Sequence, residues 1–274
     1  MDFRIFIAAA FLLSSAACQK KAEEGKRVAE AAEAPAAPEW KAHPVLGYEV
    51  VRELPHDPEA FTQGLLLSKG DWIESTGGYG TTSIRRVERE TGNVLLKKDL
   101  PVEFFGEGVA DLDGKLYQLT WKSRKGFVYD TGTLEPLGDF SYTGEGWGLT
   151  SDGESLIMSD GSDRLRYLDP KTFRVWREVR VRFNGKPVNL LNELEYIEGE
   201  IFANVWHSNF IVRIQPTDGS VLGVIDLTGI DAKARRRDPE HVLNGIAYDP
   251  EAREFFVTGK CWPKIYQIRL VPKK

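Results

Sequence analysis

The chain has 274 residues, of which 42% are hydrophobic and 28% are charged, and its formal net charge is −5. These proportions are normal for a globular protein, and the length is sufficient for one large β domain or two ordinary ones. The negative charge gives no electrostatic reason to expect a nucleic acid as partner, because phosphate binding depends on clustered Lys and Arg. The one basic run, residues 233–237, is expected to lie on a solvated loop.

The first 44 residues are predicted to serve export. Residues 1–17 combine a weakly basic start with an apolar run too short to span a bilayer, which is typical of a signal peptide. Cys18 follows small residues, as in a bacterial lipobox, although Ser15 stands where Leu is usual. Lipidation of Cys18, which would tether the chain to a membrane, and simple cleavage after Ala17 both remain open. Residues 18–44 are predicted to be a disordered tether, and the expected location is the periplasm or cell envelope.

A repeat divides the rest of the chain into five copies. Short apolar runs alternate with Gly, Asp and Asn turns, without a long 3.6-residue periodicity. The copies begin roughly 40 to 50 residues apart, which is the span of a four-stranded propeller blade. Residues 45–274 are therefore predicted to form one all-β domain, a five-bladed β-propeller. A parallel β-helix or an open sandwich is the alternative, but neither explains so long a period.

The ends of the chain are predicted to close the propeller together. The fifth copy supplies only about three of the four strands of a blade before the chain reaches Lys274. Residues 48–54 read as a strand and can supply the missing one. Closure by strands from both ends would remove the exposed sheet edges.

The first position of each copy is expected to line the central channel, since the first strand of a blade lies nearest the axis. A position used only for packing should carry one residue type, whereas these carry an acid, three amides and an indole. We interpret them as a ligand site, and a water-filled channel lined by tolerated polar groups is the alternative. The glycines that follow four of them are expected to allow close backbone approach. The five positions are Gln63, Glu107, Trp147, Asn192 and Asn244.

A second set of residues is predicted to surround the same mouth. Trp121 and Trp206 each stand fourteen residues after the first position of their copy, and Lys260 ends the corresponding stretch of the fifth copy. By the symmetry of the repeat, their side chains should converge near Trp147. The run from Gly77 to Gly80 is interpreted as a loop over this mouth.

Cysteine and histidine are too few for a disulfide framework or a zinc site. If Cys18 is consumed by processing, Cys261 has no partner for an intramolecular disulfide. No histidine is followed by a second His or Cys at the three- to five-residue spacing that zinc sites use. We therefore expect neither a metal nor a cofactor.

Eight short motifs resemble, in this order and spacing, the plant and bacterial type of glutaminyl-peptide cyclotransferase. The resemblance runs from residue 45 to 270 and implies a five-bladed propeller with metal-independent catalysis. The motifs are Phe61-Thr-Gln-Gly64, Glu74-Ser-Thr-Gly-Gly-Tyr-Gly80, Phe105-Gly-Glu-Gly108, Gln118-Leu-Thr-Trp121, Gly146-Trp-Gly148, Asn192-Glu-Leu-Glu-Tyr196, Ala203-Asn-Val-Trp206 and Leu243-Asn-Gly-Ile246.

The resemblance implies an enzyme that converts the N-terminal glutamine of peptides or proteins into pyroglutamate with release of ammonia. We expect the protein to be a monomer. The resemblance makes Glu107 the catalytic acid and base; Asn244 joins the site on the repeat alone. Which of Gln63, Asn192 and Lys260 stabilises the oxyanion is left open. The substrate residues that the resemblance implies are Phe61, Gln63, Phe105, Trp121, Trp147, Asn192, Trp206 and Lys260.

Two other functions are considered. A non-catalytic propeller, tethered to the envelope and binding peptides or partner proteins, would explain the fold and the tether equally well. It would not explain a single acid among amides and indoles. A sugar-acting enzyme would favour paired carboxylates, and the first positions contain only Glu107.

Overall fold

The computed structural model describes residues 45–230, 232 and 238–273. The predicted signal peptide, the tether with Cys18 and the basic run 233–237 lie outside the described residues. The described residues form 22 strands. Within them, the structure contains no helix that is long and apolar enough to cross a membrane.

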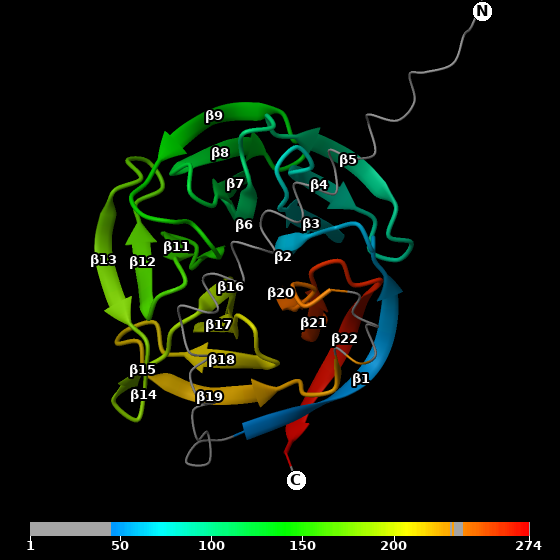
Figure 1. Ribbon diagram of the computed structural model, residues 1–274, viewed down its shortest axis with the longest axis vertical. Coiled ribbons are helices and arrows are strands. Elements are labelled where there is room, and N and C mark those ends of the chain that lie inside the picture. Colours follow the sequence, from blue (N-terminus) through cyan, green and yellow to red (C-terminus); the bar gives the residue numbers. More distant parts are fainter. Residues whose placement is uncertain (1–44, 231, 233–237, 274) are drawn as a thin grey trace, which may run out of the picture.

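Five four-stranded antiparallel units surround a common axis, which confirms the predicted five-bladed propeller (Figure 1). The first blade contains β2 (Thr62–Ser68), β3 (Asp71–Thr76), β4 (Ser83–Val87) and β5 (Val94–Asp99); the second contains β6 (Gly106–Leu112), β7 (Lys115–Thr120), β8 (Lys125–Asp130) and β9 (Pro136–Ser141). The third contains β10 (Leu149–Ser151), β11 (Leu156–Ser159), β12 (Arg164–Leu168) and β13 (Val175–Arg180). The hairpin β14 (Arg182–Phe183) and β15 (Lys186–Pro187) leads to the fourth, which contains β16 (Leu191–Ile197), β17 (Glu200–Val205), β18 (Phe210–Ile214) and β19 (Val221–Asp226).

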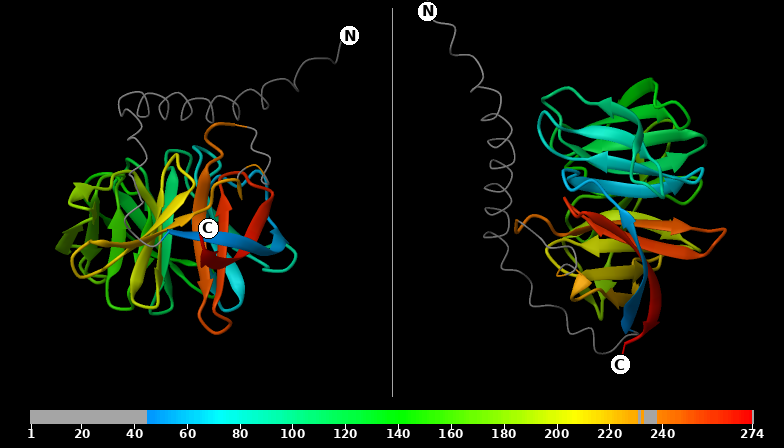
Figure 2. Two further views of the ribbon diagram at one scale, coloured as in Figure 1. Left: turned by 90° about the horizontal axis from the view of Figure 1, so that it is seen from below. Right: turned by 90° about the vertical axis from the view of Figure 1, so that its right-hand side faces the viewer.

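The fifth blade joins both ends of the described chain, as predicted. It consists of β20 (Leu243–Asp249), β21 (Glu254–Gly259), β22 (Lys264–Pro272) and the N-terminal β1 (Val45–Pro55). β1 pairs with β22 in antiparallel fashion along almost its whole length, and Figures 1 and 2 show the blue and red strands side by side. The start of β1 also pairs in parallel with β19, which joins the fourth and fifth blades in one sheet and was not predicted.

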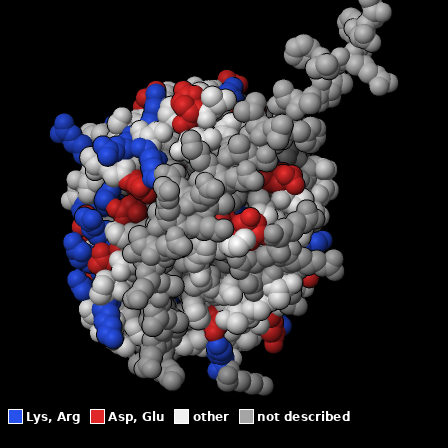
Figure 3. Space-filling view, viewed as in Figure 1, with Lys and Arg blue, Asp and Glu red and all other residues white. Residues whose placement is uncertain are grey.

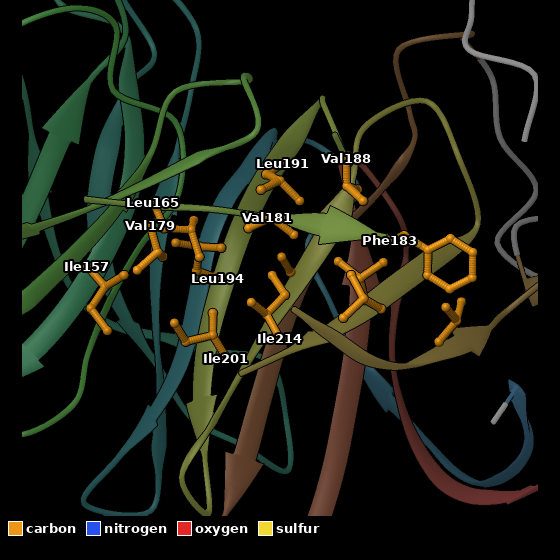
Figure 4. Packing of buried hydrophobic residues seen from close by; sticks show 14 of the residues in the cluster. Ile157, Leu165, Val179, Val181, Phe183, Val188, Leu191, Leu194, Ile201 and Ile214 are labelled. Atoms are coloured by element: carbon orange, nitrogen blue, oxygen red, sulfur yellow. The ribbon is translucent and has the colours of Figure 1, made fainter. Parts of the chain in front are cut away.

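The apolar core is divided into five clusters, each between two neighbouring blades. The inner strands are buried on both faces, so each blade packs face to face against the next. Figure 4 shows the cluster between the third and fourth blades. It includes Ile157, Leu165, Val179, Leu194, Ile201 and Ile214.

The outer strands carry the charged residues of the surface. Lys and Arg side chains gather with acids along the left edge of the face in Figure 3, over the third blade. Arg180 pairs there with Asp163 at 3.2 Å, and Arg164 lies 3.9 Å from Glu178. The basic side chains of this edge therefore lie among acidic partners.

The five inner strands contact one another in a closed ring around the axis: β2 with β6, β6 with β10, β10 with β16, β16 with β20, and β20 with β2. Their backbones approach so closely that a Cβ atom on Gly148 would lie 1.9 Å from the carbonyl oxygen of Asn192. A Cβ on Gly108 would lie 2.3 Å from the amide nitrogen of Leu149. The expected need for glycine at these positions is confirmed, and the reason is steric.

Candidate functional site

Four inner strands carry a β-bulge at the same place in their blades. The register shifts lie between Thr62 and Gly64, Gly106 and Val109, Leu191 and Leu194, and Leu243 and Ile246. A bulge bends its strand and redirects a side chain. The bulged positions include four of the five predicted site residues: Gln63, Glu107, Asn192 and Asn244.

These four polar side chains are buried at the heads of their strands. The exposed fraction is 3% for Glu107 and 2% or less for Gln63, Asn192 and Asn244. The Nδ2 of Asn244 donates to the carbonyl oxygen of Thr62 at 3.0 Å and to Oε1 of Gln63 at 3.3 Å. The side-chain amide of Asn244 thus joins the fifth blade to the first at the inner ends of both.

The backbone around Glu107 is held from both neighbouring blades. Its carbonyl oxygen accepts a hydrogen bond from the Ser75 hydroxyl, and the next amide, of Gly108, donates to the carbonyl oxygen of Trp147 at 2.6 Å. Burial raises the pKa of Tyr142 to about 12, and the charges of Glu107 and Glu145 add to this shift. Both acids therefore lie within electrostatic range of one tyrosine.

Seven side chains, which we call the rim ring, make a closed chain of contacts around the axis and come from all five blades. On one side, the ring of Phe61 packs edge-on against Phe105 with 6.1 Å between centroids. Phe105 packs in the same way against Trp121 at 5.9 Å. The members of the rim ring are Phe61, Phe105, Trp121, Glu145, Trp147, Trp206 and Lys260.

The rim ring continues through a carboxylate. The indole nitrogens of Trp121 and Trp147 both donate to Oε2 of Glu145, at 2.7 and 3.0 Å. Glu145 was not among the predicted site residues. A signal was present, because Glu145 stands two residues before Trp147, as Phe61 and Phe105 stand two residues before the first positions of their copies.

The remaining contacts close the rim ring. Trp147 packs edge-on against Trp206 with 5.3 Å between centroids. The Nζ of Lys260 lies 6.0 Å from the Trp206 ring centre and 4.9 Å from that of Phe61. Lys260 is only 2% exposed, so its ammonium group lies against aromatic faces inside the protein.

Three buried polar atoms of the site have no hydrogen-bond partner among the described residues: Oδ1 of Asn192, Oδ1 of Asn244 and Nε1 of Trp206. Buried polar atoms in folded proteins are nearly always paired, and each exception calls for an explanation. The two amide oxygens are acceptors and the indole nitrogen is a donor. A bound ligand with both kinds of group would satisfy them.

The glycine run beside the site packs against the rim ring. The amide of Gly77 donates to the carbonyl oxygen of Phe61 at 2.8 Å, and the ring of Tyr79 lies 5.4 Å from that of Phe105. A Cβ atom on Gly77 would lie 2.2 Å from the Phe105 ring, so only glycine allows this contact.

A second acid near the axis, Glu193, was also not predicted. It occupies the position at which the other four copies carry glycine, and it is 1% exposed. Its carboxyl group accepts hydrogen bonds from the amides of Leu65 and Ile246, at 3.3 and 2.9 Å. Burial raises its pKa well above the usual range. Glu193 therefore connects the fourth blade to the first and fifth.

Among the described residues, no three His, Cys, Asp or Glu side chains form a group that could hold a metal ion. The side chain of Cys261 is half-buried. That catalysis requires no metal stays a prediction.

The chain is similar to known proteins over most of its length. A family model described as glutamine cyclotransferase matches residues 22–270. A glutaminyl-peptide cyclotransferase of Arabidopsis thaliana is 46% identical over 233 residues, which cover 83% of this chain and 72% of the relative. The crystal structure of Myxococcus xanthus glutaminyl cyclase superposes with a TM-score of 0.80 at 36% identity, covering 85% of this chain and 100% of that chain.

Proposed function

Because the chain belongs to the glutamine cyclotransferase family, we propose that it converts the N-terminal glutamine of peptides or proteins into pyroglutamate and releases ammonia. The observation that carries the proposal is the position of Glu107. Its buried side chain stands two residues from the rim-ring member Phe105, at the head of an inner strand. The reaction requires a folded substrate conformer and a proton transfer. A carboxyl group close in the chain to aromatic side chains of the rim ring suits both requirements.

The proposed reaction forms one bond and breaks one. The neutral α-amine attacks the γ-carboxamide carbon, and the C–N bond to the leaving NH₂ group breaks as the lactam closes. A proton must pass from the attacking nitrogen to the leaving nitrogen, and Glu107 can accept and then donate it. Holding the glutamine in its folded conformer can itself lower the barrier by several kcal/mol.

The unpaired buried atoms have complementary parts in this mechanism. Nε1 of Trp206 is a donor and can bind the oxygen of the scissile carboxamide, while Oδ1 of Asn192 is an acceptor and can bind a hydrogen of the amine or the leaving group. The ammonium group of Lys260 can add electrostatic stabilisation as charge develops on the carboxamide oxygen. The substrate amine titrates near 8, so activity should rise with pH as it becomes neutral.

The variant Glu107→Gln tests the proposal. It keeps the size of the side chain but removes the titrating group, so ammonia release from a Gln-initiated dipeptide should fall at least about 100-fold. Circular dichroism should stay unchanged. The matched control is Glu103→Gln, an exposed acid four residues earlier, which should keep the wild-type rate.

Two outcomes would contradict the proposal. Near wild-type turnover of Glu107→Gln would remove Glu107 from the proton transfer. Absence of ammonia release from the wild-type protein, together with peptide binding, would support the non-catalytic scaffold. The same assay with a chelator present tests metal independence, for which undiminished release is expected.

We also propose that the protein is exported and acts in the periplasm or cell envelope, on the strength of residues 1–18. Mass spectrometry of the mature N-terminus separates the two forms of processing. A diacylglycerol-modified Cys18 at the new terminus would support a lipid tether. An unmodified terminus at Cys18 would support cleavage alone, and retention of Met1 would contradict export.

A further inference from the structure

Glu145 is the one acid at its place in the repeat, where the fourth and fifth copies carry Leu190 and Val242. In the first and second copies the equivalent position carries phenylalanine, and those two rings pack against each other. In the third copy it carries a half-buried carboxylate that contacts two indole rings through their nitrogens. An indole N–H can only donate, so an acceptor at this place decides where each ring edge points.

The position of Glu145 is itself fixed by its chain neighbours. The amide of Gly146 donates to the carbonyl oxygen of Trp121 at 3.0 Å. Earlier in the same segment, the carbonyl oxygen of Thr143 accepts from Nη1 of Arg166 at 2.7 Å, and Arg166 is ion-paired with Asp160. The backbone is therefore anchored on both sides of the carboxylate.

One face of Trp147 is also fixed. A Cβ atom on Gly161 would lie 2.8 Å from the Trp147 ring, so the indole packs directly against the backbone there. Its nitrogen then donates to Glu145, and its edge meets Trp206. Through its two hydrogen bonds, Glu145 joins the part of the rim ring that contains Trp121 to the part that contains Trp147.

We propose that Glu145 is a positioning residue for the proposed cyclisation: its carboxylate holds the indoles of Trp121 and Trp147 at the angles at which they confine the folded glutamine. The inference rests on the proposed function. It assigns Glu145 no proton transfer and no contact with the substrate. Its contribution is the orientation of two aromatic walls, and small errors of orientation can cost a large factor in rate.

The test compares two substitutions of Glu145. Glu145→Leu removes the acceptor at similar size, and we expect kcat/KM for a Gln-initiated dipeptide to fall about 10- to 100-fold, mainly through kcat. Glu145→Gln keeps an oxygen acceptor and should restore most of the activity. The control is Glu154→Leu. Glu154 is an exposed acid in the turn between β10 and β11, and its substitution should leave kcat and KM unchanged.

A double-mutant cycle separates positioning from direct contact. In a Trp121→Phe, Trp147→Phe background neither ring has an N–H, so adding Glu145→Leu should have an effect of less than about 3-fold. A full loss in that background, or equal losses for the Gln and Leu variants of Glu145, would overturn the proposal. Unchanged kcat and KM for Glu145→Leu would also overturn it.

Near-UV circular dichroism tests the orienting role of Glu145 independently of the enzymatic activity. Glu145→Leu should change the tryptophan bands while Glu145→Gln largely preserves them, with far-UV spectra alike. If the wild-type protein releases no ammonia, the proposed function fails, and this spectral comparison still reports whether Glu145 orients the indoles. Identical near-UV spectra for the wild type and Glu145→Leu would refute the orienting role.

Discussion

Two polar clusters, one between the first and fifth blades and the other at the site formed by all five blades, differ in how they use their hydrogen bonds. The closure cluster, defined as His56, Asp57, Thr62, Glu74 and Arg85, leaves none of its buried side-chain nitrogen or oxygen atoms unpaired. The site next to it leaves Oδ1 of Asn192 and Nε1 of Trp206 without partners among the described residues. A satisfied network stabilises the fold, whereas unpaired atoms are suited to a ligand.

The closure cluster centres on Glu74. Its Oε1 accepts from Nε2 of His56 at 2.9 Å and from the Thr62 hydroxyl at 2.7 Å, and its Oε2 accepts from Arg85 at 2.7 and 2.9 Å. His56 also faces the carbonyl oxygen of Trp262 through Nδ1. Both ring nitrogens therefore face acceptors, which favours the protonated imidazole. The cluster ties the end of β1 to the first and fifth blades.

Glu74→Gln should have the largest effect on stability. Two cationic side chains would lose a buried carboxylate, so the free energy of unfolding should fall by about 3–5 kcal/mol. Urea unfolding followed by fluorescence measures it. Glu90→Gln is the matched control, because Glu90 pairs with Arg52 at the exposed surface, and its midpoint should stay at the wild-type value. A wild-type midpoint for Glu74→Gln would show that the closure cluster does not stabilise the fold.

Asn192→Leu should separate activity from stability. It removes an unpaired buried acceptor, so kcat/KM should fall about 10-fold or more while the free energy of unfolding stays equal or rises. Asn244→Leu is the comparison, because it removes the hydrogen bonds to Thr62 and Gln63 and should lower the free energy of unfolding by about 1–3 kcal/mol. Equal destabilisation by both variants would show that the hydrogen bonds of Asn244 do not distinguish its role in stability from that of Asn192.

The smallest expected effect is a pH dependence of stability from His56. Burial alone would lower the pKa of His56, but the Glu74 carboxylate outweighs it and raises the pKa above the usual 6.5. The stabilisation should therefore be complete below 6.5 and be lost as the pH rises through the folded-state pKa. The difference in melting temperature between the wild type and His56→Gln should shrink on going from pH 6 to pH 9. A difference that grows with pH would contradict this sign.

The contribution of Glu74 to stability has the opposite dependence on pH. Burial alone would raise the pKa of Glu74, but His56 and Arg85 lower it to about 2. Its contribution is present above the ordinary value of 4.5 and is lost as the pH falls from there towards 2. Acid unfolding of the wild type should therefore begin below pH 4.5, and Glu74→Gln should lack this component.

Much of the architecture could be predicted because the signals are local. Turn residues, short apolar runs and their spacing recur in each copy, so the five blades and the closing strand follow without knowledge of distant contacts. The heads of the inner strands could be predicted for the same reason. Gln63, Glu107, Asn192 and Asn244 all lie there, and the shared bulges explain why.

Other features depend on contacts between different blades. Glu145 could be placed in its copy, but its two indole partners come from different blades, and only the packed rim ring brings them to one oxygen. The parallel pairing of β1 with β19 likewise joins segments far apart in the chain. Glu193 breaks the glycine pattern, and its amide partners lie on two other blades.

The sequence by itself determined the number of blades, the closure by both ends and the residues at the heads of the inner strands, because a repeat imposes its symmetry on every copy. Only the tertiary structure decided which polar atoms are paired. Nδ2 of Asn244 has two partners on the first blade, whereas Oδ1 of Asn244 and Oδ1 of Asn192 have none among the described residues. The nitrogen and the oxygen of the Asn244 amide thus differ in pairing, and the acceptors that the neighbouring blade presents decide which of them is satisfied.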